Sequence, residues 1–384
     1  MSTVEFITAN KIVCKIGAIQ EIADHCRQLG ISRPLIVTDR GLVKAGLIEL
    51  ITQPLNKVGI TAVIYSDIQA DPPEALVLSA TEFAQQLEVD GVIGFGGGSS
   101  LDVAKLIAVL ATSNQTLQSM YGIGQIKGKR LPLILLPTTA GTGSEVTPIS
   151  IITTGETTKS GVVSDTLLPD IAILDATLTI GLPPAITAAT GIDAMVHAIE
   201  AFTGKIKKNP YSDMLAKEAL RLMSQNLLEV VENGANLQAR SDMLLGALMA
   251  GQAFANSPVG AVHALAYPLG GNYHIPHGLS NSLVLPHVLR FNAPKAADLY
   301  AALLPSISAG KITNSGSKGC NVFIELIDNL ITDVGLPKNL QTMNIPQEDL
   351  GKLADEAMLQ QRLLVNNPRE VTREDALDIY KSAY

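Results

Sequence analysis

The sequence predicts an α/β fold followed by an all-α fold: a Rossmann-like, doubly wound domain over residues 1–180 and a helical domain over residues 181–384. Two observations predict this division. In the first part, short β-branched runs alternate with amphipathic segments, which is typical of a parallel sheet covered by helices. In the second part, long helical periods follow one another with almost no strand pattern, and Pro183 and Pro184 mark the change.

Each strand of the first part is predicted from a short apolar run that ends in a polar or glycine-rich turn, because parallel strands are buried on both faces. The amino-terminal segment over 1–17 predicts the first strand or strands. The segments 41–59 and 73–89 carry apolar residues at helical spacing, and they predict helices between the strands. The later strands are predicted over 34–39, 60–67, 91–97, 131–137 and 171–175.

The second part is predicted to be a bundle of helices. Apolar residues recur at helical spacing over 186–203, 242–256 and 320–335, and each segment is longer than an ordinary strand. Helices with such wide apolar faces must pack on one another, so we expect a second core that consists of helices alone.

The composition excludes several classes of protein. With 384 residues, 47% of them hydrophobic and 17% charged, the chain buries a large core and is not disordered. A net charge of −8 and the lack of a basic run argue against nucleic-acid or membrane partners. Cys14, Cys26 and Cys320 form no CxxC pair, which favours a reducing cytoplasm. We therefore expect a cytoplasmic protein whose partners are small molecules and copies of itself.

A glycine-rich turn follows the predicted strand over 91–97. Gly96, Gly97 and Gly98 lead into a helix that carries Ser99 and Asp102 near its start. Glycines let the backbone approach a ligand closely, and the free N–H groups of a helix start attract an anion, so the segment predicts a phosphate cradle. The alternative is a tight strand-to-helix turn, and Ser99 stands where the GxGxxG pattern has its third glycine.

Two further strand ends carry polar groups that a dinucleotide can use. The loop after 131–137 presents the hydroxyls of Thr138, Thr139 and Thr142. Such a loop either contacts a second polar part of the nucleotide or satisfies its own backbone. Asp39 can accept hydrogen bonds from ribose hydroxyls and would repel a 2′-phosphate, which predicts NAD rather than NADP. Its alternative role is to cap the next helix.

A metal site is predicted in the helical part. Asp193 and His197 lie four residues apart, hence on one face of an apolar helix, where they either pair with each other or bind a divalent cation. His263 and His277 can supply further ligands. One carboxylate and three imidazoles suit Fe²⁺, Zn²⁺, Mn²⁺, Co²⁺ or Ni²⁺. We expect His25, by contrast, to be exposed on a polar helix face.

Taken together, these motifs resemble the iron-dependent (group III) metal-containing alcohol dehydrogenase family. The resemblance covers nearly the whole chain and implies an N-terminal dinucleotide-binding domain, a C-terminal helical metal-binding domain, NAD and a divalent metal, with Fe²⁺ before Zn²⁺. It also implies a homodimer or a larger homo-oligomer. The motifs are GGGSSLDVAK at 96–105, PTTAGTGSEVT at 137–147, GIDAMVHAIE at 191–200, and VHALAYPLGG to IPHGLSN at 262–281.

By this resemblance the chain transfers a hydride between NAD(H) and a small alcohol, aldehyde or ketone, while the metal polarises the substrate oxygen. The alternatives are a hydroxyacid-oxoacid transhydrogenase and a lyase of the dehydroquinate synthase type. The implied metal ligands are Asp193, His197, His263 and His277. The implied cofactor contacts are Asp39, Gly96, Gly97, Gly98, Ser99, Asp102, Thr138, Thr139, Thr142 and Lys159.

The chain departs from the family pattern at one position. Many alcohol-active members carry a second histidine four residues after the third ligand, whereas this chain has Tyr267. With an ordinary pKa near 10, a tyrosine is a poor proton shuttle at neutral pH. His274 is the candidate substitute. The predicted catalytic residues are thus His263, His277, Tyr267 and His274.

Overall fold

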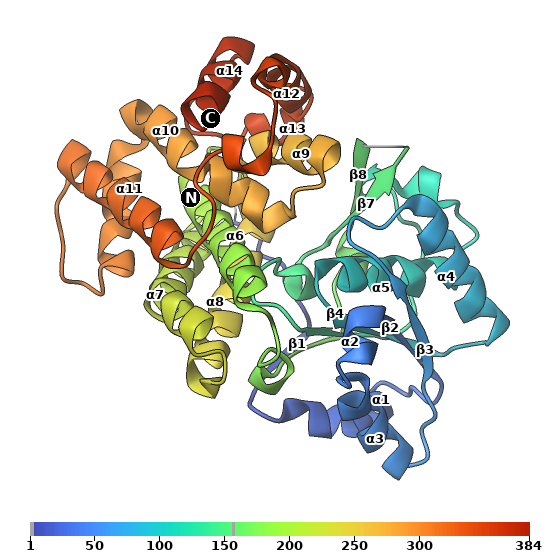
Figure 1. Cartoon of the computed structure of the whole chain (residues 1–384). Helices are drawn as coiled ribbons and strands as arrows, with labels where there is room; N and C mark the ends of the chain where they lie inside the picture. Colours follow the sequence, from blue (N-terminus) through green and yellow to red (C-terminus); the bar gives the residue numbers. More distant parts are fainter. Residues whose placement is uncertain (1–3, 156–157) are drawn as a thin grey trace. The chain divides into compact units, whose positions relative to one another are not determined.

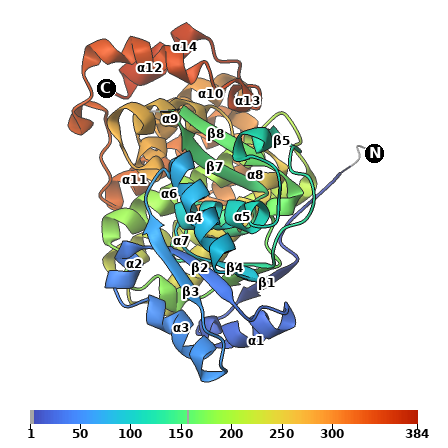
Figure 2. The ribbon, with the colours of Figure 1, turned by 90° about the vertical axis from the view of Figure 1, so that its right-hand side faces the viewer.

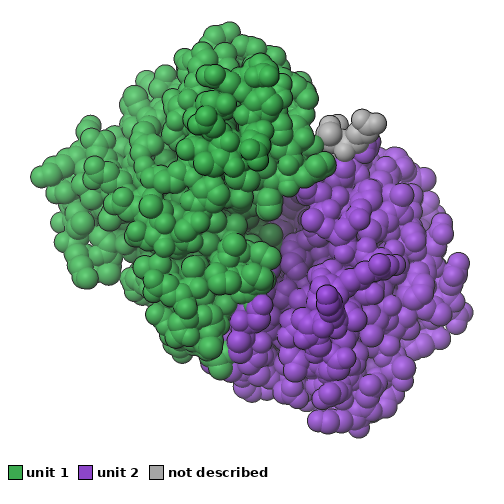
Figure 3. Space-filling model, viewed as in Figure 1, with its two compact units in different colours: residues 1–6, 140–142, 182–384 green, residues 7–139, 143–181 purple. Residues whose placement is uncertain are grey.

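The computed structural model describes residues 4–155 and 158–384, which form two compact units (Figure 1). The α/β unit contains residues 7–139 and 143–181. The helical unit contains residues 4–6, 140–142 and 182–384, and Figure 3 colours the two units separately. The loop around residue 141 thus belongs by its contacts to the helical unit, although its neighbours in sequence belong to the other one.

The α/β unit is built on a sheet with the strand order β1-β9-β6-β4-β2-β3, in which every neighbouring pair is parallel. The predicted strands are confirmed, with shifted ends: the segment 60–67 forms a strand only from Val63 onward. The strands are β1 (Lys11–Cys14), β2 (Pro34–Asp39), β3 (Val63–Ile68), β4 (Gly91–Gly96), β6 (Leu133–Pro137) and β9 (Ile171–Leu174).

Helices cover both faces of this sheet, as a doubly wound fold requires. Along β2, Leu35 and Val37 belong to one hydrophobic core and Ile36 to another, because successive side chains of a strand point to opposite faces. α4 and α5 pack in the first core, and α1 and α3 pack in the second (Figure 1). The helices are α1 (Ile22–Gln28), α2 (Arg40–Lys44), α3 (Ile48–Lys57), α4 (Glu74–Gln86) and α5 (Gly98–Leu110).

A smaller sheet, with the order β5-β8-β7, was not predicted from the sequence. β7 (Ile149–Thr154) and β8 (Thr158–Val163) form an antiparallel hairpin, and β5 (Gly122–Ile123) pairs with β8. The hairpin lies beside α5 (Figure 2), where Ile152 and Val162 join the core under that helix. It thereby brings the backbone N–H of Ile151 to Asp102 of α5.

The helical unit packs its helices around one continuous hydrophobic core, as predicted. α6 begins with Pro184, which suits a first helical position because its missing N–H would be unpaired there. Within 4–155 and 158–384, none of the helices combines the length and the apolar character that a membrane span needs. The helices are α6 (Pro184–Thr203), α7 (Pro210–Glu232), α8 (Leu237–Asn256), α9 (Ala261–Tyr273), α10 (His277–Ile307), α11 (Gly316–Asp333), α12 (Leu350–Ala357), α13 (Gln361–Leu364) and α14 (Arg373–Ser382).

Candidate functional site

Four side chains of the helical unit converge on one point. Asp193 and His197 come from α6, His263 from the first turn of α9, and His277 is the first residue of α10. Each residue offers one ligand atom, and these atoms all lie within 4.8 Å of one another. The structure therefore brings together the residues that the sequence predicts as metal ligands.

The spacing of these groups fits a cation. The Nε2 atoms of His263 and His277 lie 3.8 and 3.7 Å from Oδ1 of Asp193, and ligands at about 2.1 Å from a tetrahedral cation lie about 3.4 Å apart. Nδ1 of His197 and Nε2 of His263 are buried and have no hydrogen-bond partner among the described residues. Buried polar atoms seldom lack a partner, so this donor set suits a bound divalent metal.

The protonation states also suit a metal. Burial lowers the pKa of His197 to about 3, which leaves its imidazole neutral at physiological pH. Burial would raise the pKa of Asp193, but the three imidazoles and a hydrogen bond from Asn281 hold it below its ordinary value. The cluster therefore offers an anionic oxygen and a neutral imidazole, which are the forms that bind a cation.

Two neighbouring residues support the cluster and were missed from the sequence. Nδ2 of Asn281 donates to Oδ1 of Asp193 (2.6 Å). Oε2 of Glu200 lies 2.7 Å from Nδ1 of His263, and both groups are buried. The signal for Glu200 was present in the sequence, since a carboxylate in an otherwise apolar helical segment needs a buried partner.

The other predicted catalytic residues lie differently. The Tyr267 ring is 5.8 Å from the His277 ring between centroids, one helical turn beyond His263, and so borders the cluster. His274 is the exposed C-cap of α9 with φ of 55°, and it is not among the clustered ligand groups. The expectation for His25 was wrong, because it is buried on the same face of α1 as Ile22.

In the α/β unit, the glycine-rich turn lies between β4 and α5. Gly97 is the N-cap of α5 and Gly98 its first residue, while Ser99 follows in the first turn. Gly96 has φ of +153°, and a Cβ there would lie 2.7 Å from Oγ of Ser100. A side chain at position 96 would therefore crowd Ser100, and the N-cap of α5 has no side-chain hydrogen bond.

The second loop lies against this turn. The N–H of Thr138 donates to the carbonyl of Gly96 (3.0 Å), and Thr138 itself is buried. Thr139 is the residue that a Cβ on Gly97 would approach, at 3.8 Å. Thr142 lies farther along, in the segment that belongs to the helical unit. There Gly141 packs closely on α6, and its backbone hydrogen-bonds to the His197 ring.

Asp102 is held by protein groups. Oδ1 accepts from Ser144 and from Nζ of Lys105, the latter at 3.4 Å. Oδ2 accepts from the N–H of Ile151 in β7 (2.9 Å). Oδ1 therefore connects α5 to the second loop, and Oδ2 connects α5 to the hairpin.

The remaining two predicted cofactor contacts lie at strand ends. Oδ1 of Asp39 accepts from the N–H of Leu42 (3.0 Å) and so caps α2, which was the alternative role. Lys159 of β8 forms an ion pair with Asp71, a residue in the left-handed region with φ of 51°. Asp71 was not predicted as part of the site.

Comparisons with known proteins agree with these observations. Residues 9–176 match the family "Iron-containing alcohol dehydrogenase", and residues 187–384 match "Fe-containing alcohol dehydrogenase family, C-terminal". The chain is 41% identical to long-chain-alcohol dehydrogenase 1 of Geobacillus thermodenitrificans over 96% of this chain and 93% of that one. It is 37% identical to sulfoacetaldehyde reductase of Bilophila wadsworthia over 98% of both chains.

Solved structures show the same likeness. A crystal structure of 1,3-propanediol oxidoreductase is similar with a TM-score of 0.96 and 34% identity, over 100% of both chains. The sulfoacetaldehyde reductase of Bifidobacterium kashiwanohense, solved in complex with NAD⁺, is similar with a TM-score of 0.90 and 28% identity, over 100% of this chain and 99% of that one.

Proposed function

The chain belongs to the iron-containing alcohol dehydrogenase family and is therefore a metal-dependent, NAD-linked alcohol oxidoreductase, for which we propose a cation site formed by Asp193, His197, His263 and His277. The observation that carries this proposal is the convergence of four ligand atoms, two of them buried nitrogens without a partner among the described residues. A divalent cation, Fe²⁺ before Zn²⁺, would supply Lewis-acid polarisation of the alcohol or carbonyl oxygen, and NAD would exchange the hydride.

The chain's own residues shape the substrate side of this site. The side chains of Asp193 and His263 are each 3% exposed, whereas that of His277 is 35% exposed, so the cluster is more open toward His277. Tyr267 borders His277, and we assign its hydroxyl the role of a hydrogen-bond donor to the substrate oxygen. His274 is left out of this proposal because it is an exposed helix cap.

Replacement of Tyr267 by Phe tests that role. A single hydrogen bond contributes about 0.5–1.5 kcal/mol, so we expect kcat/KM to fall roughly three- to tenfold. The bound metal should stay at its wild-type level, because Tyr267 is not one of the four ligand groups. An unchanged kcat/KM would remove Tyr267 from the reaction.

For NAD, the proposal assigns the two glycine- and threonine-rich loops to the pyrophosphate. The contacts come from backbone N–H groups at the start of α5 and from threonine hydroxyls. These groups are uncharged hydrogen-bond donors. Asp39 would accept from the ribose hydroxyls with its second oxygen, and Asp102 would hold the loops rather than the nucleotide. The proposed contacts are Asp39, Gly96, Gly97, Gly98, Ser99, Thr138, Thr139, Thr142 and Lys159.

A substrate panel tests the activity. The protein, loaded separately with Fe²⁺, Zn²⁺ or Mn²⁺, is incubated with NAD⁺ and a long-chain primary alcohol or 1,3-propanediol, or with NADH and sulfoacetaldehyde, because the relatives carry these names. We expect steady NADH formation or consumption with at least one of them. A lyase would return the hydride within each turnover, so no NADH would accumulate and the proposal would fail.

We further propose that the protein works in the cytoplasm as a homodimer or larger homo-oligomer. Cys26 and Cys320 are free thiols, as expected in a reducing compartment. The oligomer is inferred from the family alone. Light scattering of the purified protein, with the expected result of at least twice the mass of one chain, tests it.

A further inference from the structure

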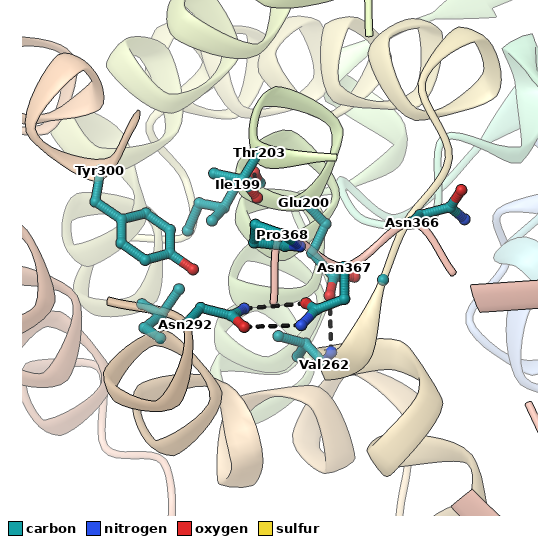
Figure 4. A pocket seen from close by; sticks show the side chains of 11 residues that line it. Ile199, Glu200, Thr203, Val262, Asn292, Tyr300, Asn366, Asn367 and Pro368 are labelled. Atoms are coloured by element: carbon teal, nitrogen blue, oxygen red, sulfur yellow. Dashed lines mark hydrogen bonds between the residues drawn. The ribbon is translucent and has the colours of Figure 1, made fainter. Parts of the chain in front are cut away.

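Glu200 joins two parts of the helical unit that meet at His263. It lies on α6, three residues after His197, and it is 6% exposed. Oε1 accepts from the N–H of Val262 (2.7 Å), and Oε2 lies 2.7 Å from Nδ1 of His263 (Figure 4 shows the contact with Val262). Each carboxylate oxygen therefore has its own partner in the first turn of α9.

The first of these contacts caps α9. The N-cap of this helix is Gly260, which has no side chain to accept a hydrogen bond from the first turn. Glu200 supplies the missing acceptor from another helix, and its negative charge lies at the positive end of the helix dipole. A Cβ on Gly260 would lie 3.3 Å from Oε1, so the glycine leaves room for the carboxylate.

The second contact determines which nitrogen of His263 carries the hydrogen. A carboxylate accepts hydrogen bonds, so Nδ1 of His263 donates to Glu200 and the lone pair is left on Nε2. That Nε2 is the buried atom without a partner among the described residues, 3.8 Å from Oδ1 of Asp193. The ring is thus held in the tautomer that a metal ligand needs.

Among the described residues, the lining of the pocket beside Glu200 supplies no competing cation. The pocket beside it has room for about one water molecule. Its polar groups include the reciprocally paired amides of Asn292 and Asn367 and the hydroxyl of Tyr300 (Figure 4). Among the described residues that line it there is no lysine or arginine. His263 is therefore flanked by two buried carboxylates, Glu200 and Asp193, and their combined charge favours a cation beyond the ring.

We propose that Glu200 is the positioning residue of the metal centre: its carboxylate caps α9 and fixes His263 in the tautomer whose Nε2 faces the cation. This inference rests on the metal site proposed above. Partners of this kind typically change metal affinity 10- to 100-fold when they are removed.

Glu200→Gln is the decisive variant, because glutamine keeps the shape and offers only one acceptor. If its oxygen stays on Val262, its NH₂ group faces Nδ1 of His263 and forces the hydrogen onto Nε2, where it blocks the metal. If its oxygen faces His263 instead, its NH₂ group faces the N–H of Val262, so that two hydrogen-bond donors meet without an acceptor. Both arrangements weaken the site, and we expect Zn²⁺ affinity to fall about 10- to 100-fold.

Glu200→Ala separates hydrogen bonding from packing. The adjoining pocket and the vacated space can admit water, which accepts from Nδ1 and leaves Nε2 free, so alanine should weaken Zn²⁺ binding less than glutamine does. A role in packing alone predicts the opposite order. Thr203→Val is the matched control, since Thr203 lies three residues farther along α6, lines the same pocket and donates only to the carbonyl of Ile199 (2.9 Å).

The readouts are Zn²⁺ affinity by chelator competition and the tautomer of His263 by ¹⁵N NMR of the metal-free protein. We expect hydrogen on Nδ1 in the wild type and in Thr203→Val. In Glu200→Gln we expect weaker Zn²⁺ binding in either arrangement, with hydrogen on Nε2 when the amide oxygen stays on Val262 and on Nδ1 when it faces His263. Wild-type affinity and tautomer in Glu200→Gln, or weaker binding in the alanine variant than in the glutamine variant, would overturn the positioning role. Failure of the proposed metal site would look different, because His263→Ala would then bind Zn²⁺ like the wild type.

Discussion

Each unit of this protein buries a group of charged and polar side chains, and the two groups differ in whether their hydrogen-bonding atoms are satisfied. In the α/β unit, Nζ of Lys105 donates to Ser144 (2.8 Å), Thr147 (3.2 Å) and the carbonyl of Ile149 (2.8 Å), and pairs with Asp102. In the helical unit, nitrogens of His197 and His263 are buried without a partner among the described residues.

This difference separates a structural network from a binding site. An ammonium group whose hydrogens are all engaged holds chain segments together and has nothing to offer a ligand. A set of buried acceptors that face one another with few donors carries a free-energy cost, and a cation bound between them would offset it. The same physical cost of burial therefore gives a structural network in one unit and, in our proposal, a metal centre in the other.

The largest effect that this comparison predicts is at His263. His263→Ala removes a ligand, so the protein should lose its bound metal and more than about a thousandfold of its turnover, since a metal supplies several kcal/mol of transition-state stabilisation. Elemental analysis and steady-state kinetics measure both, with circular dichroism as the control for folding. A full metal complement in an active variant would contradict the ligand assignment.

Lys105→Met tests the structural network around Lys105. Removing one partner of a buried charged network costs about 3–5 kcal/mol, because Asp102 keeps its charge and loses a partner. We expect the free energy of unfolding of the α/β unit to fall by that amount while the variant still binds Zn²⁺ at low temperature. Denaturant unfolding and metal titration make the comparison, and an unfolding transition like that of the wild type would show that the network adds little.

Glu145 makes the stability of the α/β unit depend on pH. Burial raises its pKa to about 7, although Lys105 is near. The folded state therefore keeps the proton that the unfolded state releases near pH 4.5. The contribution of Glu145 to stability is thus highest below pH 4.5 and declines as the pH rises to about 7. Glu145→Gln should remove up to about 3 kcal/mol of this decline. Unfolding of both proteins across pH 4.5–8 measures it, and parallel curves would exclude Glu145 as the cause.

The smallest expected effect concerns cofactor choice. Asp39→Gly removes a carboxylate that would repel a 2′-phosphate, so the use of NADP relative to NAD should rise about tenfold, or roughly 1.4 kcal/mol. Asp39→Asn is the matched control, because it keeps an acceptor for the N–H of Leu42 and loses only the charge. Equal shifts in both variants assign the effect to charge. An unchanged cofactor ratio in both would remove Asp39 from recognition of the ribose.

The sequence predicted the features that depend on local pattern. The strand over 34–39 and the helix that carries Asp193 and His197 were predicted because an apolar period is visible within a few residues. The β7–β8 hairpin was missed because its second strand, TKSGVV, is largely polar and is recognised only by what it pairs with. His25 was placed wrongly because the pattern of a single short helix did not show which face met the core.

Within the site, the ligand types were predictable and their support was not. Asp193 and His197 share a helix face by spacing alone. Glu200 and Asn281 act on groups that lie 63 and 88 residues away in sequence, and only folding brings them together. The hydrogen-bond partners of the proposed metal ligands are therefore identified only in the tertiary structure, whereas the ligands themselves can be predicted from sequence motifs.

We propose that Asp193, His197, His263 and His277 hold one divalent cation in the helical unit. Anomalous diffraction at the metal absorption edge, from crystals of the metal-loaded protein, tests it most directly. We expect a peak about 2.0–2.2 Å from one carboxylate oxygen of Asp193 and from one nitrogen of each imidazole. A peak elsewhere, with no peak within coordination distance of these four side chains, would refute the site.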